Sequence, residues 1–291
     1  MGAGVNWRVM ERRIIINADD FGLCEGVNKG IVEAHSKGVL TSATLMVNMP
    51  AAEQAVDLAK HLPKLGVGVH LNLTNGKPLC QNEGVKLLLN AEGDFGLSQG
   101  KLAIASLITG KVRAAIEAEL VAQIQWVIDR GIKPTHLDSH KHIHSFPAIF
   151  RIVCRLAKRF EIPAIRFTYE PKQVCRLPWP VTDEESRKRA AMVRIMAKIN
   201  RWQNREFFKT DALLGVAHTG NINVNFFRAV TLYNTAATAE VMTHPGYTYD
   251  LDATRTRLVK QRQVELEALC SEKTKQYFKE TGIKLVHYGQ L

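Results

Sequence analysis

The stretch IIINADDFGL, residues 14 to 23, joins a run of β-branched residues to two adjacent carboxylates, a Phe and a Gly. The apolar run predicts a buried strand that ends at Asp19 and Asp20. Neighbouring carboxylates repel each other, and partial burial makes it still more costly to keep both ionised. The stretch therefore predicts that a cation or a proton-holding group lies close to this pair.

The rest of the chain alternates strand-like apolar runs with helix-like periodic runs, which indicates βα units and a parallel sheet. We expect strands at residues 13–17, 40–48, 67–73, 135–138, 164–168, 212–217 and 240–243. We expect helices at residues 28–36, 51–61, 112–130, 146–160, 184–208, 226–233 and 255–280. This alternation predicts a barrel-like α/β fold, complete or imperfectly closed.

No internal repeat or linker divides the sequence, so we expect a single domain over residues 1–291, with its core in residues 10–291. Residues 76–110 are rich in Gly, Asn and Leu without clear periodicity and are expected to form an extended loop. Residues 170–210 are expected to form a basic helical insertion.

The five cysteines are scattered without a Cys-X-X-Cys spacing, which argues against a disulfide framework and a zinc ribbon. A reducing, cytoplasmic location fits this pattern best. Residues 1–13 lack the apolar core of a signal peptide, and no segment approaches the roughly 20 apolar residues that span a bilayer. Residues 1–9, ahead of the first strand, are interpreted as a candidate dispensable leader.

The net charge of +11 and the pI of about 9.5 permit attraction to anionic substrates, nucleic acid or membrane surfaces. Much of the excess lies in residues 186–209, where basic and apolar residues alternate at helical spacing. The favoured interpretation is a solvated amphipathic helix packed on the body of the protein, and the alternative is a contact surface for an acidic partner or a membrane. The basic residues are Arg187, Lys188, Arg189, Arg194, Lys198, Arg201, Arg205 and Lys209, and the apolar ones are Met192, Ile195, Met196, Ile199 and Trp202.

Active sites of parallel α/β folds lie at the carboxyl ends of the strands, so we compared the residues at those positions. They are carboxylates, imidazoles, an amide and a guanidinium. Carboxylate and imidazole groups are the ligands of catalytic zinc and related divalent ions. One aspartate of the opening pair could bind the ion while the other takes a proton from water. The residues are Asp19, Asp20, Asn48, His70, Asp138, His140, His142, His144, Arg166 and His244.

Each of these features also has a purely structural interpretation. The aspartate pair could cap the following helix, and His70 alone would more often be a half-buried packing residue. The run HLDSHKHIH, residues 136–144, is harder to explain in this way, because four histidines and an acid fall within nine residues. One or two of these histidines are expected only to pack or to orient a ligand. Taken together, the strand-end residues favour a metal site.

Four ordered motifs resemble the YdjC-like carbohydrate deacetylase family, whose best-known member removes acetyl groups from chitooligosaccharides. They are NADDFGLCEGVNKGI (17–31), LTSATLMVNMP (40–50), GVGVHLNLTNGKPL (66–79) and KPTHLDSHKHIHSFP (133–147). A weaker similarity continues through PAIRF (163–167) and MTHPG (242–246). The resemblance implies a distorted (β/α) barrel of the glycoside hydrolase/deacetylase type.

The resemblance also implies one divalent metal ion, Mg²⁺ or Zn²⁺, held by Asp20, His70 and His140, with Asp19 as the general base. His244 is the candidate acid that protonates the leaving amine, by analogy with related deacetylases, because a neutral-range imidazole suits that role. Arg166 would orient or electrostatically tune Asp19, or else form a surface ion pair. A homodimer is also implied by the resemblance alone.

The leading functional hypothesis is metal-dependent hydrolysis of N-acetyl groups from an amino sugar or short oligosaccharide such as a chitooligosaccharide, with release of acetate. Because residues 169–208 match no family pattern and other relatives act in hopanoid lipid biosynthesis, a lipid-linked sugar at a membrane surface is an alternative substrate. A metal-dependent phosphoesterase would require two metal ions. A non-catalytic basic protein that binds nucleic acid is not expected, since no RNA-binding or helix-turn-helix motif is found.

Overall fold

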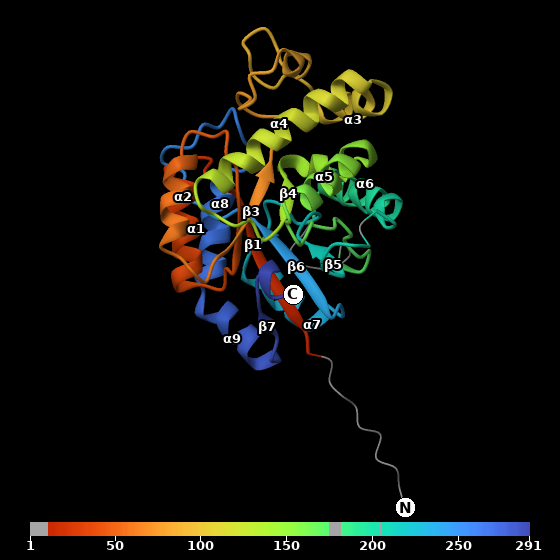
Figure 1. Ribbon diagram of the computed structural model, residues 1–291. Coiled ribbons are helices and arrows are strands. Elements are labelled where there is room, and N and C mark those ends of the chain that lie inside the picture. Colours follow the sequence, from red (N-terminus) through yellow and green to blue (C-terminus); the bar gives the residue numbers. More distant parts are fainter. Residues whose placement is uncertain (1–10, 175–181, 204) are drawn as a thin grey trace, which may run out of the picture.

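The structure is a computed structural model that describes residues 11–174, 182–203 and 205–291 (Figure 1). Within these residues, seven strands form one parallel sheet in the order β4-β3-β2-β1-β6-β5, with β7 paired to β1. The sheet is curled, and its outer strands β4 and β5 do not pair with each other, so the expected barrel is an open half-barrel. The strands are β1 (Arg13–Phe21), β2 (Ser42–Leu45), β3 (Gly66–Leu71), β4 (Leu137–Ser139), β5 (Ala212–Leu214), β6 (Thr238–Thr243) and β7 (Lys284–Leu285).

Helices surround the curled sheet. Figure 1 shows α1, α2 and α8 at its left and α5 and α6 at its right, with α4 running across the top. No helix in the described ranges is long and apolar enough to cross a membrane. The helices are α1 (Glu25–Lys37), α2 (Ala52–Lys60), α3 (Gln99–Ile108), α4 (Gly110–Asp129), α5 (Pro147–Arg159), α6 (Glu184–Asn200), α7 (Val224–Tyr233), α8 (Lys260–Cys270) and α9 (Glu272–Thr281), with short 3-10 helices η1 (Glu83–Leu88), η2 (His140–Ser145) and η4 (Tyr288–Gln290).

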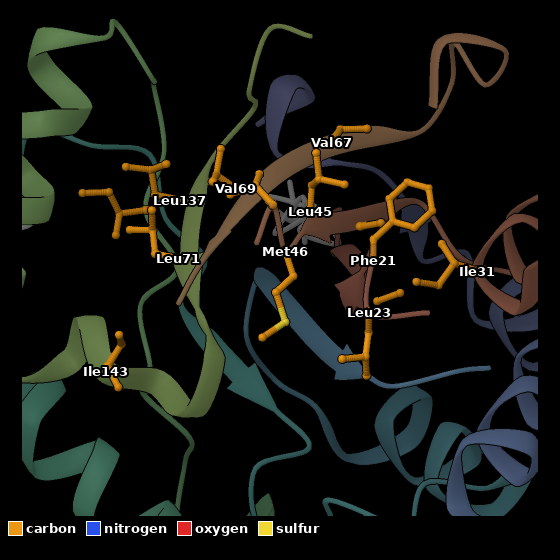
Figure 2. Packing of buried hydrophobic residues seen from close by; sticks show 14 of the residues in the cluster. Phe21, Leu23, Ile31, Leu45, Met46, Val67, Val69, Leu71, Leu137 and Ile143 are labelled. Atoms are coloured by element: carbon orange, nitrogen blue, oxygen red, sulfur yellow. The ribbon is translucent and has the colours of Figure 1, made fainter. Parts of the chain in front are cut away.

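The core lies on both faces of the sheet, which explains why the strands appear in the sequence as continuous apolar runs. Ile14, Ile15 and Ile16 of β1 are all fully buried. Figure 2 shows side chains of neighbouring strands, such as Val69 and Leu137, meeting in this core. Full burial of one such side chain stabilises the fold by about 1.5–3 kcal/mol. The carboxyl ends of the strands are therefore fixed by a packed core.

The prediction of a strand at residues 164–168 is wrong. The segment makes isolated bridges instead, to Leu137 of β4 and to Phe208. A tight turn follows, in which the Tyr169 N–H donates to the carbonyl of Phe167 at 2.8 Å, so the backbone leaves β4 before a ladder can form.

The prediction of an extended loop over residues 76–110 is also wrong, because η1 and α3 lie within it. Ser98 caps α3 by accepting a hydrogen bond from the Lys101 N–H at 3.4 Å. Only Leu102 and Ser106 of this helix are buried, whereas other apolar side chains on it are exposed. The helical period was not visible in the sequence because the apolar residues of α3 do not gather on its buried side.

Two predicted helices have different ends in the structure. The segment 255–280 begins its helix only at Lys260 and divides into α8 and α9 at Ser271, whose backbone is extended. The segment 184–208 ends its helix at Asn200. This helix, α6, packs on the body through small side chains, including Ala190, and of the expected apolar set only Met196 packs against the core.

Candidate active site

A cavity of about 480 Å³ opens at the carboxyl ends of the central strands. It brings together residues from four segments that are far apart in the sequence, as the strand-end argument predicts. Six of the predicted site residues line it. They are Asp19, Asp20, His70, His140, His142 and His244.

The aspartate pair lies near the end of β1, which continues to Phe21. The pairing of β1 with β2 is irregular between Ala18 and Phe21, and Asp20 has a left-handed backbone with φ of 66°. A positive φ is uncommon for residues other than Gly and often marks a functional site. The helix-cap interpretation of the pair is wrong, because the N-cap of α1 is Cys24.

Gly22 makes this turn possible. Its φ is 99°, and a Cβ atom at this position would lie 3.0 Å from the backbone oxygen of Met46. The Gly22 N–H donates to Asn28 Oδ1 at 2.7 Å, which holds the turn against the start of α1. The Gly of the opening stretch thus lets the chain turn sharply beside the two acids.

Asp20, His70 and His140 converge on one point. Asp20 Oδ1 lies 3.4 Å from His70 Nε2 and 3.2 Å from His140 Nδ1. All three residues are largely buried, and Asp20 Oδ1 has no hydrogen-bond partner among the described residues. Burial alone would raise the pKa of Asp20, but Arg262 and the two imidazoles hold it well below its ordinary value. Asp20 is therefore an ionised carboxylate with one oxygen free for a ligand.

The other side of His70 is held by Asp138. His70 Nδ1 lies 2.8 Å from Asp138 Oδ1, and Asp138 Oδ2 accepts a hydrogen bond from Thr44 at 3.1 Å. A carboxylate on the far nitrogen is the usual arrangement that orients a metal-binding histidine. Burial alone would lower the pKa of His70, but Asp138 and Asp19 raise it to about 10. Asp138 and Asp19 thus make the surroundings of His70 electrostatically negative, which favours a bound cation.

These features fit a divalent metal ion. One carboxylate oxygen and two imidazole nitrogens lie within 4.8 Å of one another, and this donor set is typical of catalytic sites that keep open positions. The unpartnered oxygen of Asp20 and the fixed orientation of His70 support the same interpretation. The residues that could hold the ion are therefore Asp20, His70 and His140.

Asp19 is held by a buried network rather than by the metal-binding set. Arg166 donates to both of its oxygens, at 2.7 and 2.9 Å, and Asn17 donates to Oδ1 at 3.0 Å. Arg166 is fully buried, so the alternative of a surface ion pair is wrong. The guanidinium also contacts Glu240 at 2.6 Å, and Glu240 accepts a short hydrogen bond from the Tyr288 hydroxyl. Burial would raise the pKa of Asp19, but Arg166 lowers it overall.

Sequence reasoning missed Arg262 of α8. This side chain is fully buried and donates to Asp20 Oδ2 at 2.5 Å, so it fixes the oxygen that faces away from the histidines. The sequence offered no signal for this role, because the residue lies in a strongly charged segment. Glu240 was missed as well, although an acid inside an apolar strand was a visible clue.

His244 lies near Asp19, with its Nε2 atom 3.9 Å from Asp19 Oδ2. Burial lowers the pKa of His244 to about 4, which differs from the neutral-range imidazole that we expected. The His244 backbone N–H donates to Glu265 Oε2 at 2.6 Å. Burial raises the pKa of Glu265 to about 8. In the metal-free protein, the His244 and Glu265 side chains are therefore both uncharged near pH 7.

Glu265 gives a testable pH dependence of stability. The folded protein holds a proton on Glu265 up to about pH 8, whereas the unfolded chain releases it near the ordinary value of 4.5. The stabilisation is therefore complete below pH 4.5 and is lost as the pH rises through 8. We expect the free energy of unfolding of the wild type, minus that of Glu265→Gln, to fall by up to about 1.4 kcal/mol per pH unit in this range. Urea unfolding of chelator-treated samples at several pH values would measure this difference. A difference that does not change with pH would contradict the raised pKa of Glu265.

The remaining candidates have different surroundings. His144 Nδ1 lies 2.5 Å from Ser139 Oγ, and its Nε2 lies 3.2 Å from the Arg166 carbonyl, so it is a structural residue. His142 lines the cavity, but its Nδ1 has no partner among the described residues. Asn48 is not in the cavity lining and instead donates to the carbonyl of Asn75 at 2.9 Å. The expectation that some histidines of this run serve structure is consistent with these contacts.

Comparison with known proteins decides the family. The model of the YdjC-like protein family matches residues 13–280. The chain belongs to the YdjC-like family. A carbohydrate deacetylase of Brevibacillus brevis is 38% identical over 279 residues, which cover 96% of this chain and 99% of that protein. A chitooligosaccharide deacetylase of Salmonella paratyphi B is 47% identical over 149 residues, which cover 51% of this chain and 56% of that protein.

The solved structures contain a similar fold. This YdjC-like chain superposes on the crystal structure of an Enterococcus faecalis V583 protein with a TM-score of 0.77 and 25% sequence identity. The match covers 96% of this chain and 98% of that one. Cleavage of cellobiose phosphate has been ascribed to that protein. The family and the distorted α/β barrel that the four motifs imply are thus confirmed, and the barrel is an open half-barrel.

Proposed function

We propose that this protein is a metal-dependent carbohydrate deacetylase, which hydrolyses the N-acetyl group of an amino sugar or short oligosaccharide and releases acetate. The observation that carries the proposal is the convergence of Asp20, His70 and His140 beside Asp19 in one cavity. The deacetylase names of the relatives support the same reaction. We also propose that the protein acts in the cytoplasm, because its cysteines lack the spacing of a disulfide framework.

Asp20, His70 and His140 would hold one divalent ion, Mg²⁺ or Zn²⁺. When bound, such an ion supplies Lewis-acid chemistry, which acidifies a water and polarises a carbonyl. Asp138 orients His70, and Arg262 keeps the second oxygen of Asp20 turned away from the imidazoles. The chain thus supplies both the ligands and the groups that position them.

Asp19 would act as the general base. Its Oδ1 accepts hydrogen bonds from Asn17 and Arg166, whereas its Oδ2 accepts one from Arg166 and faces His244. Oδ2 therefore has a free lone pair on the cavity side. Because Arg166 favours the ionised form, Asp19 is ready to take the proton of the attacking water as the carbonyl carbon is attacked.

His244 would deliver the proton that the leaving amine needs. Its low pKa means that the free enzyme holds a neutral imidazole, so the proton must arrive during the reaction. Asp19 Oδ2, at 3.9 Å, is close enough to pass on the proton after a small movement. The two residues together would return to the amine the proton taken from water.

The phosphoesterase alternative needs a second metal ion, and the structure offers a place where this can be examined. Asp19, His70 and Asp138 form a second possible group of ligands. Arg166 Nη1 already contacts one oxygen of each of these acids, at 2.9 Å for Asp19 and 2.8 Å for Asp138. A guanidinium in that position neutralises the acids and opposes a second cation, so a single ion is favoured.

A direct assay would test the proposal. Purified protein with measured metal content would be incubated with diacetylchitobiose and a panel of N-acetylated sugars, and acetate release would be followed. We expect release from at least one substrate, and none after chelation of the metal. If the loaded protein released no acetate from any N-acetylated sugar but released phosphate from sugar phosphates, the deacetylase assignment would be wrong.

A further inference from the structure

Two helices at the rim of the cavity carry apolar side chains on their exposed sides. The first residues of α3 and α6 reach the cavity, since Gln99 of α3 and Glu185 and Arg189 of α6 line it. Figure 1 shows α3 and α6 on the same side of the molecule as α5, which contacts both. Both helices therefore begin at the cavity.

The exposed side of α6 forms a row at helical spacing. Met192, Ile195 and Ile199 recur every three or four residues, and Trp202 continues the spacing just after the end of the helix. Their exposed fractions are 37%, 55%, 51% and 70%. Burial of α6 against the body is achieved by other positions, such as Val193. This row is a contiguous apolar stripe that nothing in the described chain covers.

A basic row runs beside this stripe. Arg187, Lys198 and Arg201 are exposed, and none of them pairs with a carboxylate in the part of the chain that the structure describes. Arg205 stacks on the Trp202 ring, with its guanidinium carbon 3.5 Å from the ring centroid. The stripe is thus bordered by positive charge that the protein itself leaves uncompensated.

The exposed side of α3 has the same character. Ile104 and Ile108 are 59% and 75% exposed, and Lys101 on the same helix is exposed, as is Lys111 at the start of α4. Residues 99–116 contain no Asp or Glu. Both helices therefore combine exposed apolar groups with uncompensated cations.

We propose that the exposed sides of α3 and α6 form a docking face for an anionic lipid membrane. Apolar side chains between basic ones are the pattern of helices that lie in a membrane interface, where Lys and Arg meet lipid headgroups and Trp and Ile enter the acyl boundary. A second copy of the chain is a poorer occupant, because a two-fold contact would place each basic row against its own copy. This face places the cavity entrance beside the membrane surface. The inference does not depend on which reaction the cavity performs.

Vesicle flotation would test the docking face. We expect the full-length protein to bind vesicles that contain about one third phosphatidylglycerol, to bind phosphatidylcholine vesicles much less, and to be released as the salt concentration rises tenfold from about 0.05 M. Two double variants, which we call the paired variants, should each lower the partition coefficient at least about tenfold. One combines Ile199→Ser with Trp202→Ser, and the other combines Lys198→Glu with Arg201→Glu. Tryptophan fluorescence should shift to the blue on binding in the wild type, and the variant that lacks Trp202 should lose most of this shift.

Matched controls lie on α7 and α9, outside the proposed docking face. Leu232→Ser on α7 removes an equally exposed apolar side chain, and Lys273→Glu on α9 reverses an exposed charge, so both should bind vesicles as the wild type does. Circular dichroism and the oligomeric state would be measured for every variant. Absence of wild-type binding, or binding unchanged in both paired variants, would overturn the proposal. It would also be overturned if the paired variants converted a dimer into monomers without any vesicle binding by the wild type.

Discussion

Asp19→Asn is expected to leave the metal content nearly unchanged and to lower kcat by about 100- to 10,000-fold, the range for loss of a general base. Asparagine keeps the shape of the side chain and can still accept a hydrogen bond from Arg166, but it cannot take the proton of the attacking water. Asp20, His70 and His140 are untouched by this change. Turnover would be measured by acetate release, and metal by elemental analysis of the same samples.

The network around Arg166 makes this variant suitable for the test. Arg166 also contacts Asp138 at 2.8 Å and Glu240 at 2.6 Å, so the buried cation keeps two carboxylate partners when Asp19 is neutralised. The fold should therefore survive, and a melting curve would check this. If metal were lost in proportion to activity, Asp19 would be a ligand, and the division of roles between the two aspartates would be wrong.

His140→Ala should remove the metal ion from the site. His140 is one of the three candidate ligands, with Asp20 and His70, and its loss should weaken metal affinity by more than the about 10- to 100-fold that is typical for residues that only orient a ligand. Activity should fall with metal occupancy. Metal titration followed by calorimetry would give the affinity, and acetate release at saturating metal would show how much activity returns.

His142→Ala is the matched control, because it removes an imidazole two positions away in the same segment, η2. His142 lines the cavity but is not part of the group that could hold the ion. We expect this variant to keep its metal and most of its activity. Full metal occupancy in His140→Ala, or equal metal loss in the two variants, would contradict the ligand assignment.

Much of the cavity could be predicted from the sequence because its residues follow buried strands. An apolar run that ends in Asp19 and Asp20, and another that ends in His70, place these side chains at the carboxyl edge of a parallel sheet. His140 and His244 were found by the same reasoning. Local sequence was sufficient here, since the residue type and its position after a strand both carry the signal.

The residues that support the cavity could not be predicted in this way. Arg262 and Glu265 lie on α8, in a segment whose many charges are typical of a solvated helix, yet both side chains are buried. Their partners, Asp20 and the His244 backbone, are brought to them only by the complete fold. Helix α3 was missed for a related reason. Many of its apolar residues are exposed, so they do not recur with the helical period that marks a buried side.

The contact between Arg262 and Asp20 joins residues 242 positions apart. A ribosome synthesises the chain from its N-terminus, so Asp20 leaves the exit tunnel long before α8 has been made. Until then, the left-handed turn at Asp20 lacks the cation that fixes its second oxygen. The metal site would therefore be complete only after α8 has been synthesised and has folded. A nascent chain released before that point would contain the aspartate pair but lack Arg262, which positions Asp20.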